Sequence, residues 1–118
     1  MNFQIVRDEY YPLFLDKLYL SIPEFYESYK SEILEYDEDE THFILSVFTR
    51  FINENSSNKE LITRSLNFIN EAYNQGGWKT KDTIQDHLFD NLVINKNILN
   101  IYKSCLDGKC LITFELYL

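Results

Sequence analysis

The stretch SIPEFYESYKSEILEY, residues 21–36, decides the fold class because its apolar side chains recur at helical spacing. Such positions lie three or four residues apart, as on one face of an α-helix. They are Ile22, Phe25, Tyr26, Tyr29, Ile33 and Tyr36. Pro23 suits the first helical turn, where a missing N–H costs little. Ser21 and Glu24 form a capping box, so the stretch predicts an amphipathic helix with its glutamates outward.

The same periodicity recurs in four further segments, each of which we expect to be a helix. They are Ile44 to Ile52, Ser57 to Tyr73, Thr80 to Val93 and Ile98 to Cys105. Ser57 and Glu60 form a second capping box. We expect Gly76-Gly77 to end its helix in the left-handed conformation that glycine often takes at this position.

The two ends of the chain are assigned on different grounds. Residues 3–20 are expected to be helical, with Pro12 dividing a short piece from a helix around Pro12 to Leu20. Residues 110–118 have a strand-like composition, but a lone strand would have no partner in a helical domain. We favour a last helix there and leave a strand open. The predicted fold is an all-α, single-domain bundle of five to seven helices over residues 1–118.

The net charge of −8 lies entirely in the first half of the chain. Residues 1–54 contain 12 acidic and 4 basic side chains, whereas residues 55–118 contain 7 of each. An acidic surface is unsuited to nucleic acid, whose phosphates need a cationic footprint, and to anionic membranes. We therefore expect no nucleic-acid or membrane partner, and a basic protein partner instead.

Most of that charge is concentrated between residues 24 and 40, where eight carboxylates face one cation, Lys30. Concentrated like charge repels itself, so a domain that keeps such a block is expected to meet something cationic there. A solvated polar face, with some of the acids at a helix N-terminus, is the alternative. The side chains predicted to bind the partner are Glu27, Glu32, Glu35, Tyr36, Asp37, Glu38, Asp39 and Glu40.

Catalytic and metal-binding motifs are absent from the sequence. His42 and His87 lie outside any H-E-x-x-H or nucleophile motif, so we expect ordinary surface or half-buried histidines. Residues 37–40 lack the spacing of an EF-hand loop. Cys105 and Cys110 are expected to be free thiols. The chain is thus predicted to be no enzyme, with no metal and no cofactor; a small metal-binding or hydrolytic enzyme centred on a histidine is the lesser alternative.

Two further expectations concern the cellular location of the protein and the position of its tryptophan. No apolar run approaches the ~20 residues of a membrane-spanning helix, and the first nine residues lack the features of a secretory signal, so a cytoplasmic location is expected. Trp78, the only tryptophan, follows the double glycine. We expect it to close the core beneath a loop rather than to serve as an exposed anchor.

Four segments together resemble the small immunity proteins of bacterial polymorphic-toxin and contact-dependent growth inhibition systems. They are Ile22-Pro23-Glu24-Phe25, the acidic stretch 32–40, Phe48-x-x-Phe51-Ile52, and Ile84 with His87-Leu88-Phe89-Asp90-Asn91-Leu92. The resemblance implies a non-enzymatic protein that binds one cognate toxin and blocks its active site or substrate path. Many such toxins are nucleases with basic clefts. A DNA-mimic or anti-restriction protein is the alternative, and would spread its carboxylates at about phosphate spacing along an elongated surface.

Overall fold

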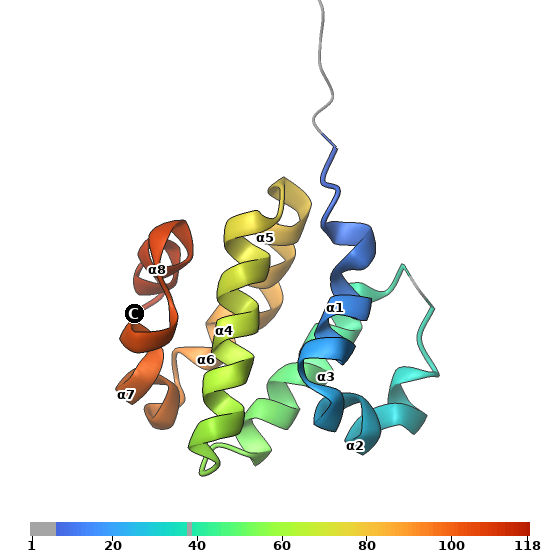
Figure 1. Cartoon of the computed structure of the whole chain (residues 1–118), viewed down its shortest axis with the longest axis horizontal. Helices are drawn as coiled ribbons and strands as arrows, with labels where there is room; N and C mark the ends of the chain where they lie inside the picture. Colours follow the sequence, from blue (N-terminus) through green and yellow to red (C-terminus); the bar gives the residue numbers. More distant parts are fainter. Residues whose placement is uncertain (1–6, 38) are drawn as a thin grey trace, which may run out of the picture.

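Helices make up most of the described chain, residues 7–37 and 39–118, in the computed structural model of the protein (Figure 1). The elements are the 3-10 turn η1 (Tyr11–Leu13), α1 (Phe14–Ser21), α2 (Pro23–Ile33), α3 (Thr41–Glu54), α4 (Lys59–Gln75), α5 (Trp78–Ile84), the π-helix η2 (Gln85–Phe89), α6 (Asp90–Leu92), α7 (Lys96–Cys105) and α8 (Gly108–Glu115). Since α5, η2 and α6 are continuous, the described residues form seven helices besides η1 and no strand. The prediction of an all-α bundle of five to seven helices is confirmed.

Helix α4 is the centre of the bundle (Figure 1). It contacts α1 on one side, α7 and α8 on the other, and α5. Helix α2 packs mainly on α1 and α3, and the acidic segment follows it. The buried side chains form one apolar cluster, in which edge-to-face and tilted aromatic pairs connect neighbouring helices. Phe48 of α3, for example, lies 5.0 Å from Phe25 of α2 and 6.5 Å from Phe68 of α4 between ring centroids.

Neither predicted capping box is present. Ser21 is the last residue of α1, and α2 begins directly after Ile22, whose side chain makes no capping hydrogen bond. An N-cap residue needs an extended backbone. Because only one residue separates the two helices, Ser21 keeps the helical backbone of α1 instead. Helix α4 is capped by Asn58 and not by the preceding Ser57. The Asn58 Oδ1 atom accepts from Leu61 N at 3.1 Å. Pro23 does occupy the first turn of α2, as predicted.

Gly76 ends α4 for a steric reason, and the predicted left-handed conformation is wrong. Its φ and ψ are −73° and 159°. A Cβ atom there would lie 2.5 Å from the Thr80 side chain and 2.6 Å from the Ala72 carbonyl oxygen. Glycine is required because the end of α4 and the start of α5 approach each other closely. The left-handed glycine is Gly108, at the start of α8, with a φ of 54°.

The turn at Gly76-Gly77 also explains two errors around α5. The helix begins at Trp78, earlier than the predicted Thr80 or Lys81. Thr80 and Ile84, four residues apart, face the core, which leaves Trp78 on the outer side with 64% of its surface exposed. The prediction that Trp78 closes the core is therefore wrong.

The chain ends fit the predictions only in part. Residues 7–10 are not helical, because the Asp8 carboxylate accepts from the backbone N–H groups of Tyr10 and Tyr11, both at 3.1 Å, and holds a local turn. Residues 3–6 lie outside the described part of the chain. At the other end, the favoured last helix is confirmed as α8, which buries Cys110 and Phe114. Cys105 and Cys110 are buried free thiols, as predicted. Across the described ranges, the helices are too short or too polar to cross a bilayer.

Replacing Gly76 by alanine should destabilise the fold by about 1–3 kcal/mol, because the added methyl group overlaps the Ala72 carbonyl and the Thr80 side chain. Urea unfolding followed by circular dichroism measures the change. Gln75→Ala, at the exposed last residue of α4, is the matched control and should change stability by less than about 0.5 kcal/mol. Equal effects of the two substitutions would contradict the steric explanation.

Candidate partner-binding surface: an acidic loop and an aromatic cleft

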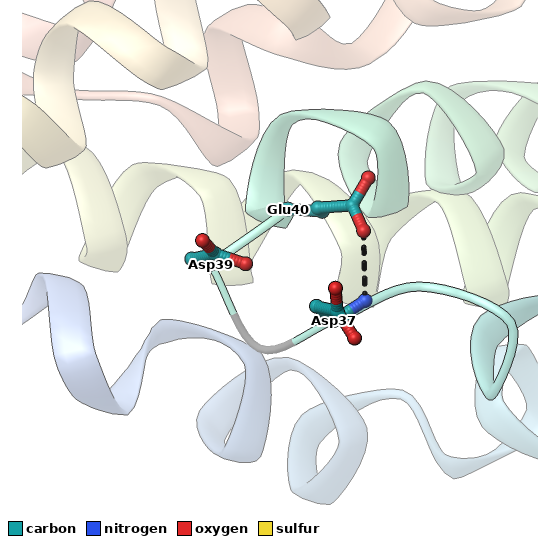
Figure 2. Close-up of side chains that lie close together, drawn as sticks. All are labelled: Asp37, Asp39 and Glu40. Carbon is teal, nitrogen blue, oxygen red and sulfur yellow. Dashed lines mark hydrogen bonds between the residues drawn. The ribbon is translucent and has the colours of Figure 1, made fainter.

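The connection between α2 and α3 stands out from the bundle (Figure 1). We call its described residues, 34–37 and 39–40, the acidic loop; its carboxylates are Glu35, Asp37, Asp39 and Glu40. Glu40 is the N-cap residue of α3, but its side chain turns back and Oε1 accepts from Asp37 N at 3.0 Å (Figure 2). This hydrogen bond closes the loop onto itself.

Three carboxylates of the acidic loop gather closely (Figure 2). Oxygens of Asp37, Asp39 and Glu40 lie within 4.8 Å of one another. At this distance each pair repels by about 1 kcal/mol in water. The same arrangement of oxygens is what a hard cation such as Ca²⁺ uses, and these are the residues that would hold one. An acidic cluster alone does not establish a metal site, and one of its carboxylates is already bonded to the backbone.

Two glutamates of the acidic block are neutralised within the molecule. Arg50 donates from Nη1 and Nη2 to both Glu32 carboxylate oxygens at 3.0 Å. Arg64 binds Glu24, with Nη1 at 3.1 Å from Oε1, and donates from Nε to Glu60 at 2.7 Å. The hydrogen bonds from Arg64 lower the pKa of Glu24. Glu32, predicted to bind the partner, thus already has a partner of its own.

The other predicted carboxylates lack such pairing. Within residues 7–37 and 39–118, the three ion pairs involve Glu24, Glu32 and Glu60. The remaining predicted acids are Glu27, Glu35, Asp37, Asp39 and Glu40. All of these are exposed except Glu40, which is half-buried. Glu38, which is also predicted to bind the partner, lies outside the described residues. The unpaired charge therefore concentrates in the acidic loop, with Glu27 on the preceding helix.

A cleft of about 540 Å³ opens beside the acidic loop, between η1–α1, α2 and the start of α3. The buried Ile33 and Ile44 contribute apolar surface to its lining. The other lining residues are half-buried tyrosines, two exposed carboxylates and four smaller or aliphatic side chains: Tyr11, Tyr19, Tyr26, Tyr36, Asp16, Asp37, Pro12, Leu15, Leu34 and Thr41. Tyr36 and Asp37 belong to both the cleft and the acidic loop, so the two features form one continuous surface.

The tyrosine rings of the cleft are held by their neighbours. Tyr19 and Tyr26 lie 4.9 Å apart between centroids. Tyr36 stacks on Phe43 at 5.4 Å with an interplanar angle of 13°, and Phe43 is itself 43% exposed. Burial raises the pKa of Tyr19 to about 12, with smaller contributions from Tyr26 and Asp16. Tyr19 therefore ionises at a more alkaline pH than a free tyrosine does.

The structure brings the two histidines together, a contact that the sequence did not predict. His42 of α3 and His87 of η2 are both half-buried, with ring centroids 5.5 Å apart. The Thr49 hydroxyl lies 3.2 Å from the His87 carbonyl oxygen, which fixes η2 against α3. The group of three side chains that could together bind a metal ion is Asp37, Asp39 and Glu40 of the acidic loop. Among the described residues, the two histidines belong to no such group.

Two acidic or aromatic features escaped the sequence analysis. One is the cleft itself, whose lining from η1 and α1 includes Pro12, Leu15, Asp16 and Tyr19, residues at helical spacing for which the sequence predicted no role in binding. The other is an exposed stripe of Asp82, Asp86 and Asp90 along α5–η2–α6. All three raise the pKa of Tyr117, after the larger effect of burial. Their spacing of four residues was the available signal.

Comparison with known proteins gives a family for this chain. A family model described as a domain of unknown function (DUF7674) matches residues 15–110. The chain belongs to the DUF7674 family. The match runs from α1 into α8 and so includes the acidic loop and most of the cleft lining. Neither a curated protein nor a solved structure matches this DUF7674 chain.

Asp39→Asn should stabilise the DUF7674 domain by about 1–1.7 kcal/mol at low salt. The change removes two repulsive pairs of about 1 kcal/mol each, which exceeds the 0.3–1 kcal/mol that a carboxylate gains near the N-terminus of α3. Urea unfolding at low and high salt measures the change in the free energy of unfolding. The gain in stability should be smaller at high salt, which screens the repulsion. Glu27→Gln is the control and should have little effect; a loss of stability in Asp39→Asn would contradict the repulsion.

Alkaline pH should destabilise the fold through Tyr19. Its folded-state pKa rises from the ordinary 10.0 to about 12, so the unfolded chain releases this proton first. The contribution of the neutral phenol is complete below pH 10 and is lost as the pH rises towards 12. Stability measured across this interval should fall less steeply in Tyr19→Phe than in the parent chain. Identical slopes would show that Tyr19 is not desolvated.

Proposed function

We propose that this DUF7674 protein is an immunity protein that binds a basic protein toxin and occludes its active site or substrate path. The observation that carries the proposal is the acidic loop, where four carboxylates that form no ion pair with another described residue stand out beside an aromatic cleft. Retaining like charges within 4.8 Å lowers stability, which favours a role in recognition. The proposal makes the protein a non-enzymatic, cytoplasmic inhibitor.

The arrangement suits fast and selective association. Complementary charge accelerates encounter with a cationic surface and disfavours wrong partners. Aromatic side chains at the centre of an interface supply most of the affinity, and Tyr36 with its stacking partner Phe43 offers such an anchor next to Asp37. A nuclease toxin, whose phosphate-binding cleft is basic, is the partner class that we favour.

The stripe of Asp82, Asp86 and Asp90 favours one second candidate, a DNA mimic. Carboxylates at successive helical turns imitate a row of phosphates, and such a mimic would occupy the nucleic-acid site of a DNA-binding protein. Lys79 and Lys81 lie on the same helix and reduce this charge, so the acidic loop remains the stronger feature. The two candidates depend on different carboxylates, which makes them separable.

Coexpression with the product of the gene immediately upstream tests the proposal. The parent chain should restore growth to cells that produce the upstream gene product. The triple variant Glu35→Lys, Asp37→Lys, Asp39→Lys should not. With purified proteins, the association rate of the variant should fall at least about tenfold at low salt, and the difference should narrow at high salt.

The matched control reverses the three aspartates of the second stripe, Asp82, Asp86 and Asp90, to lysine. Full protection by this control and none by the acidic-loop variant would support the immunity function. The opposite pattern would favour the DNA mimic. A harmless upstream product, or equal protection by both variants, would contradict the role of the acidic loop.

A further inference from the structure

The aromatic cleft combines three properties that point to a cationic side chain as its occupant. Its lining includes buried apolar side chains, four tyrosines and two carboxylates. Among the described residues that line the cleft, none is basic, and the two charged ones are Asp16 and Asp37. A long cationic side chain suits this combination, because its alkyl stem packs on apolar surface while its head group stays near carboxylates.

The tyrosine hydroxyls of the cleft are available as hydrogen-bond acceptors. Four tyrosine hydroxyls elsewhere in the fold are bonded to other side chains, as in Tyr73 with Thr113 and Tyr102 with Glu115, whereas the buried Tyr10 hydroxyl has no partner among the described residues. Within residues 7–37 and 39–118, the hydroxyls of Tyr11, Tyr19, Tyr26 and Tyr36 make no such bond. A donor-rich ligand entering the cleft finds these oxygens without having to displace an internal partner.

Two of these rings already bind cations of the chain itself. Lys79 Nζ lies 4.5 Å from the centroid of Tyr11, and Lys30 Nζ lies 5.7 Å from that of Tyr26. Neither lysine is among the residues that line the cleft. These contacts show that both rings can hold a cation over their face. Tyr19 and Tyr36 have no lysine or arginine over their rings in the described structure.

Arginine fits the cleft better than lysine does. Its planar guanidinium group stacks on aromatic rings and presents several N–H donors at once to carboxylate and phenol oxygens. Lysine presents one strongly hydrated point charge. Only arginine can stack on a tyrosine and still pair with Asp16 or Asp37 through its edge.

We propose that the aromatic cleft binds an arginine side chain of the basic partner, with the guanidinium against the tyrosines and paired with Asp16 and Asp37. This inference rests on the proposed function, since it names the group by which the partner is recognised. The acidic loop attracts the partner, and the adjoining cleft selects arginine. The binding site is thus composed of α1, α2 and the start of α3 as well as the loop.

Titration of the full chain with the blocked tripeptide N-acetyl-Gly-Arg-Gly-amide, followed by ¹H–¹⁵N NMR, tests the cleft without any partner protein. The shifts should centre on residues 11–19 and 33–44. The peptide with citrulline, which keeps the shape but not the charge, should cause none, and the lysine peptide should bind more weakly. Asp16→Asn should weaken the arginine peptide about three- to fivefold, since Asp16 is exposed and its replacement leaves the fold intact.

Asp86→Asn, an exposed aspartate outside the cleft, is the matched control and should bind as the parent chain does. Equal weakening in both variants, shifts spread over the Asp82–Asp90 stripe, equal binding of lysine and arginine, or no saturable binding would each overturn the inference. Binding of the arginine peptide together with a failed coexpression test would leave the cleft established and reject only the toxin as partner. The reverse result would keep the acidic loop and reject the cleft.

Discussion

The burial of Phe25 is the contact on which the whole acidic side of the molecule depends. Its ring is fully buried and lies 5.0 Å from Phe48 and 5.4 Å from Phe51 of α3 between centroids. Burying such a side chain stabilises the fold by about 1.5–3 kcal/mol, more than any single repulsive pair of the acidic loop opposes. Because α2 is held to α3 through this aromatic contact, the loop between them can carry carboxylates that repel one another.

Internal ion pairs divide the acidic block into two groups with different roles. Glu24 and Glu32 bind Arg64 and Arg50, which come 40 and 18 residues later in the chain, and so help to attach α2 to α4 and α3. The carboxylates of the acidic loop form no ion pair that attaches one helix to another within the described residues. A block that is uniform in sequence is therefore part structural and part exposed, and its exposed part adjoins the cleft.

Local periodicity made most of the fold predictable. The apolar stripes of α3, α4 and α7 were found from spacing alone, because each helix buries one face against the core. Contacts between distant segments were not predictable. Asp8 accepts from Thr80 N across 72 residues, and Gly76 is required by the approach of Thr80. The cleft likewise combines α1, α2 and α3, so only its Tyr36 and Asp37 were identified beforehand.

The buried thiol of Cys110 gives the opposite side of the bundle a chemical property of its own. Burial raises the pKa of this thiol to about 12, so almost none of it is thiolate at neutral pH. Since the thiolate is the species that reacts with oxidants and alkylating reagents, Cys110 stays inert for as long as α8 remains packed on α4. Its rate of alkylation therefore reports how often α8 detaches, independently of events at the acidic loop.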